Sequence, residues 1–220
     1  MSKKNEKEEY LAKQEEFCEL YNIDFKKVKN LNSTIIFLIE NGLGKPALLA
    51  IKDAYADINQ NMDYWLNIWH LSNNPETKQN PQQKSLLDLF LYMLLVEGIS
   101  SKLVQLITFI LMEHDHDIYD PEKRKFVESY EDLKRISLFI KMQFIEKHGF
   151  NLLSDAVDRE LRNFIAHIDL IVNEDGTIVN KRTEATIRDL EQKTNDLGGV
   201  IAIILNVINY SLERIDAIEK

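Results

Sequence analysis

Three polar side chains in the segment DRELRNFIAHIDL (residues 158–170) have the types needed for acid–base chemistry on a phosphate group. Arg162 offers a permanent cation whose planar fork of N–H donors matches a phosphate. His167 can accept or donate a proton near neutral pH, and Asn163 can hold a phosphate or ribose oxygen or orient the histidine. This set could act on a phosphodiester without a metal, so we expect neither a metal nor a cofactor.

The same segment has the periodicity of an amphipathic helix. At about 100° per residue, Arg162, Asn163 and His167 fall on one side, around the small Ala166 that leaves room for a ligand. The helical geometry adds Arg159 to this side as a weaker candidate for substrate binding. The other side carries the apolar residues Leu161, Phe164, Ile165 and Ile168. Spacing alone favours an ordinary solvated helix face over a catalytic one, because polar residues also belong on the outside of a surface helix.

The sequence RNFIAH (residues 162–167) resembles the motif of the HEPN superfamily, R-N-x-x-A-H, at all four fixed positions. The context is similar too: the motif lies on a late helix of a helical chain that closes with an apolar helix, and the resemblance covers roughly residues 85–220. It implies a metal-independent endoribonuclease of the kind found in toxin–antitoxin and other defence systems. It also implies a homodimer in which the two motif helices form one cleft.

The resemblance assigns a role to each motif residue. His167 would be the general acid or base that assists attack of a ribose 2′-OH on the adjacent phosphate. Arg162 would bind that phosphate and stabilise the developing charge, and Asn163 would orient the phosphate or the histidine. RNA would be the substrate, and an antitoxin or another protein could be a partner. Some HEPN proteins are instead non-catalytic modules that bind a nucleotide or a protein, and this alternative stays open.

Glu97 is the second candidate outside the motif, because it lies in the strongly apolar segment YMLLVEGISSKLV. A carboxylate in such surroundings is costly unless it is paired. One interpretation makes it the partner of Arg162 or His167. The other places it at a partly exposed position beside Gly98, or in a pair with Lys102.

The segment MEHDHDIYD (residues 112–120) contains two histidines and several carboxylates, which are possible metal ligands. Its histidines are two residues apart and therefore do not share a helical face. We expect a polar helix end there and no metal site.

Composition and patterning favour an all-α fold that positions these residues. The chain of 220 residues is 45% hydrophobic and has only 7 glycines and 4 prolines, which favours long helices. We expect a bundle of about five to seven helices, with one small β-hairpin near residues 170–180 around Glu174-Asp175-Gly176. Helical periodicity predicts long helices at about residues 46–71, 85–113 and 183–217.

Several boundaries follow from capping and breaking residues. Pro121 is expected to begin a helix that runs to about His148. Asn151 or Ser154 is expected to open the motif helix. Gly198-Gly199 predicts a bend in the closing helix, whose apolar residues 200–215 are expected in the core or at the dimer interface.

Domain organisation is suggested by the polar loop at residues 72–84. Residues 1–80 would then form an N-terminal helical extension or lobe and residues 81–220 the HEPN-like domain, although one continuous domain is the alternative. Nothing in the sequence assigns a function to the first 80 residues.

Charge and hydropathy limit the kinds of partner and the cellular location that we expect. The net charge of −9 argues against a basic protein that wraps nucleic acid, but it leaves room for a small positive site. The apolar stretch 86–112 contains Asp88, Glu97 and Lys102, so we expect a buried helix rather than a membrane span. With one cysteine (Cys18) and no apolar N-terminal run, we expect a cytoplasmic protein.

Overall fold

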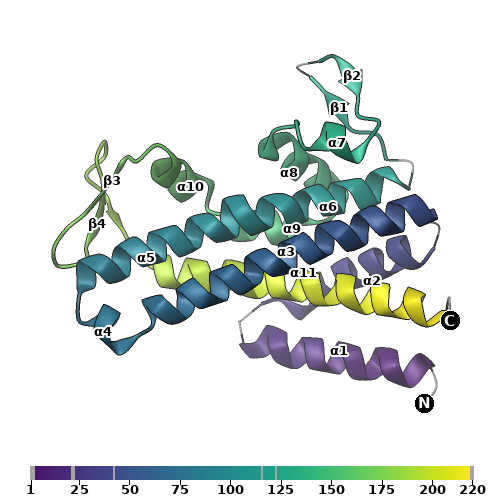
Figure 1. Ribbon diagram of the computed structural model, residues 1–220, viewed down its shortest axis with the longest axis horizontal. Helices are drawn as coiled ribbons and strands as arrows, with labels where there is room; N and C mark the ends of the chain where they lie inside the picture. The colour runs from purple at the N-terminus through teal and green to yellow at the C-terminus, as the bar shows by residue number, and fades with distance from the viewer. Residues whose placement is uncertain (1–2, 21–22, 42, 115, 122, 219–220) are drawn as a thin grey trace.

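Three long helical elements lie side by side along the molecule in the computed structural model (Figure 1), which describes residues 3–20, 23–41, 43–114, 116–121 and 123–218. The first is α3 (Lys45–Ser72). The second, called the central rod below, joins α5 (Pro81–Met93), a π-helical segment η1 (Leu94–Ser100) and α6 (Ser101–Met112). The third is α11 (Leu190–Ile218). The all-α class predicted from the sequence is confirmed.

One hydrophobic core runs through all three elements. Its fully buried members come from α3, from the central rod and from α11, and include Ile51, Ile58, Leu95, Leu103, Ile201 and Ile204. Helix α2 (Phe25–Glu40) adds Ile35 and Ile39 to this core and packs along α11. Helices from the first 80 residues therefore share a core with the helices that follow them.

Shorter elements surround these helices. The remaining helices are α1 (Lys3–Leu20), α4 (Pro75–Lys78), α7 (Tyr130–Leu133), α8 (Leu138–Lys147), α9 (Asn151–Ala156) and α10 (Arg159–Ala166). Two small antiparallel sheets consist of β1 (Tyr119–Asp120) with β2 (Lys125–Phe126), and of β3 (Leu170–Val172), β4 (Ile178–Asn180) and β5 (Thr186–Ile187). The helices are more numerous than expected because several span only four to eight residues.

The helix expected from Pro121 to about His148 is wrong. Pro121 lies in the turn between β1 and β2, and two separate helices, α7 and α8, follow. The buried carboxylate of Asp120 explains the turn, because its Oδ1 accepts a hydrogen bond from the backbone N–H of Lys123 (3.2 Å). Local side-chain bonding of this kind competes with helix formation.

Helix α11 continues without interruption through Gly198-Gly199, where a bend was expected. A Cβ atom built at Gly198 would lie 3.8 Å from Trp65 and 3.9 Å from Leu95. This close packing against α3 and η1 offsets the weak helix propensity of glycine.

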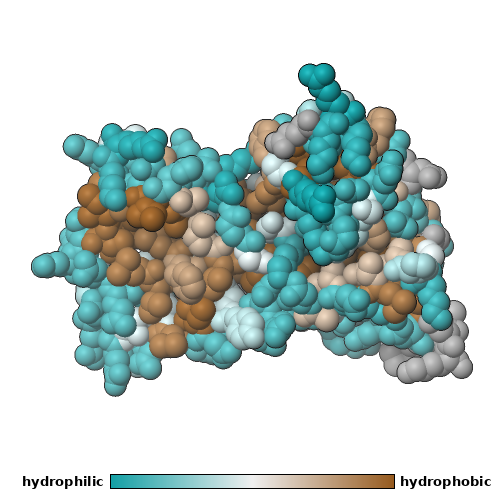
Figure 2. All heavy atoms as spheres, turned by 45° about the horizontal axis from the view of Figure 1, so that its top comes forward, coloured by the Kyte–Doolittle hydropathy of each residue, from teal (hydrophilic) through white to brown (hydrophobic). Residues whose placement is uncertain are grey.

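Some large apolar side chains stay outside the core and gather on one end of the molecule. Figure 2 shows them over the end that carries α5 and the three-stranded sheet. The exposed patch, as it is called below, consists of Leu86 and Phe90 on α5 together with Ile168 and Ile171. Clustered apolar exposure of this kind is typical of a contact surface.

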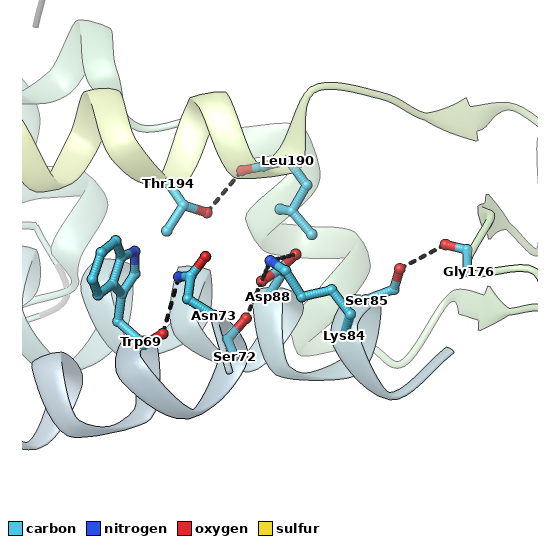
Figure 3. A network of polar contacts seen from close by, with 9 residues as sticks. All are labelled: Trp69, Ser72, Asn73, Lys84, Ser85, Asp88, Gly176, Leu190 and Thr194. Carbon is cyan, nitrogen blue, oxygen red and sulfur yellow. Dashed lines mark hydrogen bonds and ion pairs between the residues drawn. The ribbon is translucent and has the colours of Figure 1, made fainter. Parts of the chain in front are cut away.

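The hairpin predicted near residues 170–180 is confirmed, with Leu170 paired to Asn180 and Val172 to Ile178. Polar contacts anchor it to α5: Ser85 Oγ donates to Gly176 O (2.7 Å, Figure 3) and Gln82 Nε2 donates to Val172 O (3.0 Å). The sheet is thus fixed to the start of the central rod.

The start of the central rod is itself tied to the end of α3. The half-buried Asp88 accepts hydrogen bonds from Lys84 Nζ (2.5 Å) and from Ser72 Oγ (2.6 Å), as Figure 3 shows. The rod, α3 and the sheet therefore form one connected support.

Two helical stretches, residues 81–112 and 190–216, are long and apolar enough to cross a membrane by length and composition. In the most apolar windows of these stretches, 72% and 61% of the residues are buried inside the fold. Core helices of soluble proteins pass the same test, so this finding is weak evidence for a membrane span.

Candidate functional site

The motif helix α10 begins at a tightly held junction. Asp158 is its N-cap, and the Asp158 side chain accepts a hydrogen bond from the backbone N–H of Leu161 (2.9 Å) and pairs with Lys193 of α11. The buried hydroxyl of Tyr92, on α5, accepts from Asp158 N (2.9 Å) and donates to Asp158 O (3.2 Å). The predicted start at Asn151 or Ser154 is wrong, because these residues belong to the separate helix α9.

Two pKa shifts reflect this junction. Burial raises the pKa of the Tyr92 hydroxyl, so it stays neutral and can both donate and accept. Burial would also raise the pKa of Asp158, but the hydrogen bonds from Leu161 and Lys193 outweigh this and hold it below its usual range. The cap is therefore a carboxylate at neutral pH.

The C-terminal end of α10 is a Schellman motif. The N–H of Ile168 donates to Ile165 O (3.0 Å) and the N–H of Asp169 donates to Phe164 O (2.9 Å). Ile168 occupies the left-handed position with a φ of 55°. Glycine usually takes this position, and a β-branched residue there is strained.

The predicted apolar face of this helix is wrong at one residue, Ile168. Leu161 is buried, and Phe164 and Ile165 are half-buried, as the helical periodicity predicts. Ile168 is instead 75% exposed, because the helix ends at Ala166 and the chain turns away.

The loop that leaves the motif is held by the three-stranded sheet. Lys181 donates through Nζ to Ile168 O (2.8 Å) and through its backbone N–H to Asp169 O (2.7 Å). Arg182 forms an ion pair with Asp169 (2.8 Å). Neither basic residue was predicted from the sequence, and only the hairpin signal pointed to this region.

Arg162 is positioned by the central rod. Its Nε donates to the carboxylate of Glu97, and its Nη1 donates to Asn163 Oδ1 (3.1 Å). Each interpretation of Glu97 is correct in part: it pairs with Arg162 and it is exposed beside Gly98, whereas Lys102 pairs with Asp57 instead (2.6 Å). Glu97 lies in the π-helical segment η1, and such interruptions of a helix are frequent at functional sites.

Arg159 lies against α8. Its Nη2 forms an ion pair with Glu146 (2.6 Å), and its guanidinium carbon is 5.7 Å from the ring centroid of Phe139. Phe139 was not predicted, because nothing in the local sequence links it to residues 159–163.

A cavity of about 320 Å³ opens between α8 and α10. Arg159, Arg162 and Asn163 line it together with Phe139 and other apolar residues, and His167 does not. The structure therefore brings three of the predicted site residues to one cavity, and Glu97 forms an ion pair with one of them, Arg162. His167 stays outside the cavity, at the C-terminal end of the same helix.

The His167 side chain is exposed. Among the residues that the structure describes, its imidazole has no hydrogen-bond partner, although its backbone N–H caps the helix by donating to Asn163 O (3.0 Å). The ring is thus available to a ligand or to another chain.

Two carboxylates offset the positive charge of the site, since Glu97 pairs with Arg162 and Glu146 with Arg159. An arginine has five N–H donors, however, and Nη2 of Arg162 makes no hydrogen bond within the described part of the chain. A phosphate would therefore share these guanidinium groups with carboxylates that hold them in place.

No group of three or more histidine, cysteine or acidic side chains that could hold a metal ion occurs within the described residues. In the segment 112–120, His114 contacts Leu38 O and the His116 ring packs against His148 (4.4 Å), while Asp115 lies outside the described residues. The polar groups of the candidate site are an amide, an imidazole, guanidinium groups and their carboxylate partners.

Comparisons with protein-family models, with curated proteins and with solved structures found no match to this chain. The likeness of residues 162–167 to the HEPN motif accordingly rests on the motif and on its helical context.

Proposed function

We propose that this protein is a HEPN-like, metal-independent endoribonuclease that acts as a homodimer, in a toxin or other defence system. One observation carries the proposal. Arg162 on α10 is held by Glu97 of η1 and by Asn163, and the same short helix ends at an exposed His167 whose imidazole has no hydrogen-bond partner among the described residues. The ion pair with Glu97 on the central rod holds the Arg162 guanidinium group at the edge of the cavity.

The proposed reaction uses only these groups. The 2′-OH attacks the adjacent phosphorus atom, the bond from phosphorus to the 5′ oxygen breaks, and the products are a 2′,3′-cyclic phosphate and a 5′-OH. The proton of the 2′-OH passes to a histidine base, and the 5′ oxygen receives a proton from an acid. Arg162 stabilises the charge on the phosphate oxygens through its uncommitted Nη2.

A homodimer supplies what one chain lacks. A single His167 cannot accept the proton of the 2′-OH and donate a proton to the 5′ oxygen in the same step, whereas two copies provide one base and one acid. The exposed patch of Leu86, Phe90, Ile168 and Ile171 gives apolar area beside the motif for such a contact. Most apolar residues of segment 200–215, by contrast, are buried inside the chain, so this segment contributes to the core rather than to the proposed interface.

A non-catalytic module that binds a nucleotide is the second candidate. The cavity favours it, because Arg159, Arg162 and Asn163 line a space that His167 does not reach. Such a module would bind a nucleotide without cleaving RNA, and replacement of His167 would leave binding unchanged.

The test is RNA cleavage in EDTA by the wild type and by His167→Ala. We expect cleavage by the wild type and a loss of about 100-fold or more in the variant, as is typical when a general acid or base is removed. His70→Ala is the matched control, because His70 is also exposed but packs on Trp69 at the end of α3. Loss of wild-type cleavage on chelation contradicts the metal-free mechanism, and absence of cleavage favours the binding module.

A further inference from the structure

The cavity between α8 and α10 combines an apolar interior with cationic edges. Val96, Met142 and Val157 are buried side chains that line it, and Leu138 and Phe139 complete its apolar wall. The polar part comes from α10, through Arg159, Arg162 and Asn163. At about 320 Å³, the cavity lies at the small end of the range for ligand sites.

We propose that this cavity is a nucleobase subsite, in which one unpaired base of an RNA strand stacks on Phe139 and Arg159. Nucleic-acid-binding proteins stack bases on aromatic rings and on guanidinium planes, and this cavity is lined by both. The inference rests on the proposed function, because it assigns the group next to the phosphate that Arg162 would hold.

Charge and shape favour a base with its phosphate over a purely apolar ligand. Arg162 lines the cavity and has an uncommitted Nη2, so a phosphate can bind at the edge while the base enters. The ion pair between Arg159 and Glu146 keeps the guanidinium group beside the Phe139 ring. A base inside a duplex cannot enter, because its faces are already covered by its neighbours.

The order along α10 sets the arrangement of the strand. The cavity lies beside Arg159, Arg162 and Asn163, whereas His167 ends the helix outside the cavity. The stacked base would thus anchor one side of the phosphate while His167 faces the other side, so the subsite would determine which bond of the strand is presented.

The experiment measures binding separately from cleavage. The probe is a fluorescein-labelled oligoadenylate RNA of about eight nucleotides, a length within the usual range of single-strand sites. It is titrated into the His167→Ala protein, which cannot cleave it, and into the same protein with Phe139→Ala or Phe37→Ala. Phe37 is the matched control, since it is 61% exposed on α2, whereas Phe139 is 54% exposed.

We expect Phe139→Ala to raise the Kd for this probe about tenfold, the usual size of one lost stacking contact. Phe37→Ala should change the Kd less than about twofold, and Phe139→Trp should retain binding, because both leave the stacking surface intact. A probe of abasic nucleotides should bind equally to the His167→Ala proteins with and without Phe139→Ala, because it has no base that could stack on Phe139.

The outcomes separate this proposal from the proposed function. Equal effects of Phe139→Ala and Phe37→Ala, or no binding of the single-stranded probe, overturn the subsite even if the wild type cleaves RNA. A Phe139-dependent Kd in a protein that never cleaves RNA supports the subsite and rejects the catalysis.

Discussion

Helices α10 and α11 are linked by the ion pair between Asp158 and Lys193 but are held in different ways. Helix α11 runs from Leu190 to Ile218, and its apolar residues are buried along α2, α5 and η1. Helix α10 has eight residues and places only Leu161 fully in the core. Ile165 packs against the core while half-buried, and the two ends of the helix are held by polar contacts with Tyr92, Lys193 and other side chains.

This difference separates stability from function within one fold. The free energy of folding comes mainly from apolar burial, so the core elements can tolerate little change in their interior. The site depends on several weak contacts from distant segments, each of which can be removed without unfolding the chain. Core variants should therefore change stability, and site variants should change activity or the local fold.

The largest expected effect is on the core side of the comparison. Leu103→Ala removes a fully buried side chain of α6 and should lower the free energy of unfolding by about 2–5 kcal/mol. Leu49→Ala, at an exposed position of α3, should change it by about 0.5 kcal/mol or less. Urea denaturation measures both, and equal losses would mean that this core is not the source of stability.

Gly176→Ala tests the support between the sheet and the central rod. Gly176 has a φ of 84°, and a Cβ there would lie 2.9 Å from Pro81, so the variant should lose about 1–3 kcal/mol. Gly198→Ala is the control, because an added Cβ would make only ordinary contacts and should stabilise α11 by up to about 1 kcal/mol. Thermal unfolding measures the stability of both variants. A Gly176→Ala protein as stable as the wild type would argue against the close contact with Pro81.

Asp158 tests the N-terminal end of α10. Asp158→Ala should cost about 1 kcal/mol through loss of the helix cap, whereas Asp158→Asn keeps an acceptor and should cost less. The folded-state pKa of Asp158 is lowered, so its charge stabilises the fold above about pH 4, and this contribution disappears as the pH falls through the folded-state pKa. Denaturation at several pH values should show the wild type and Asp158→Asn converging in acid; a constant difference would contradict this.

Ile168 gives an effect as small as that of Asp158 but of opposite sign. Ile168→Gly relieves the left-handed backbone strain and should stabilise the isolated chain by about 1 kcal/mol, whereas Ile168→Ala keeps the strain. Denaturation is measured at a concentration where sedimentation shows monomers. Both variants should weaken self-association, because both remove an apolar side chain of the exposed patch. A less stable Ile168→Gly would mean that the backbone is not strained.

The sequence was a good guide to features with local causes. Pro46 lies at the start of the long helix predicted from about residue 46, and Glu174-Asp175-Gly176 forms the predicted turn, in which Asp175 accepts from the N–H of Thr177 (2.9 Å). The helix of Pro81, by contrast, begins inside the segment predicted as a polar loop. The pair of Glu97 with Arg162 was one of the alternatives that the sequence offered, because an acidic residue in an apolar segment needs a partner. These signals depend on near neighbours or on one strong energetic rule.

Features with distant causes could not be predicted. Phe139 reaches the site only because α8 packs beside α10, and the exposure of Ile168 follows from where the helix ends. Pro121 begins a turn rather than a helix because a buried Asp120 binds the backbone of Lys123. The first case depends on a tertiary contact, whereas the other two depend on where a helix ends and on a local side-chain bond that competes with helix formation.

The most direct test of the central claim uses a DNA strand that contains a single ribonucleotide. If the face of α10 is catalytic, the wild-type protein cuts next to that ribonucleotide in EDTA and leaves a 2′,3′-cyclic phosphate, which mass spectrometry identifies. His167→Ala should give no product above background, while His70→Ala should match the wild type. Cleavage at deoxyribonucleotides, or equal cleavage by His167→Ala, would contradict the account.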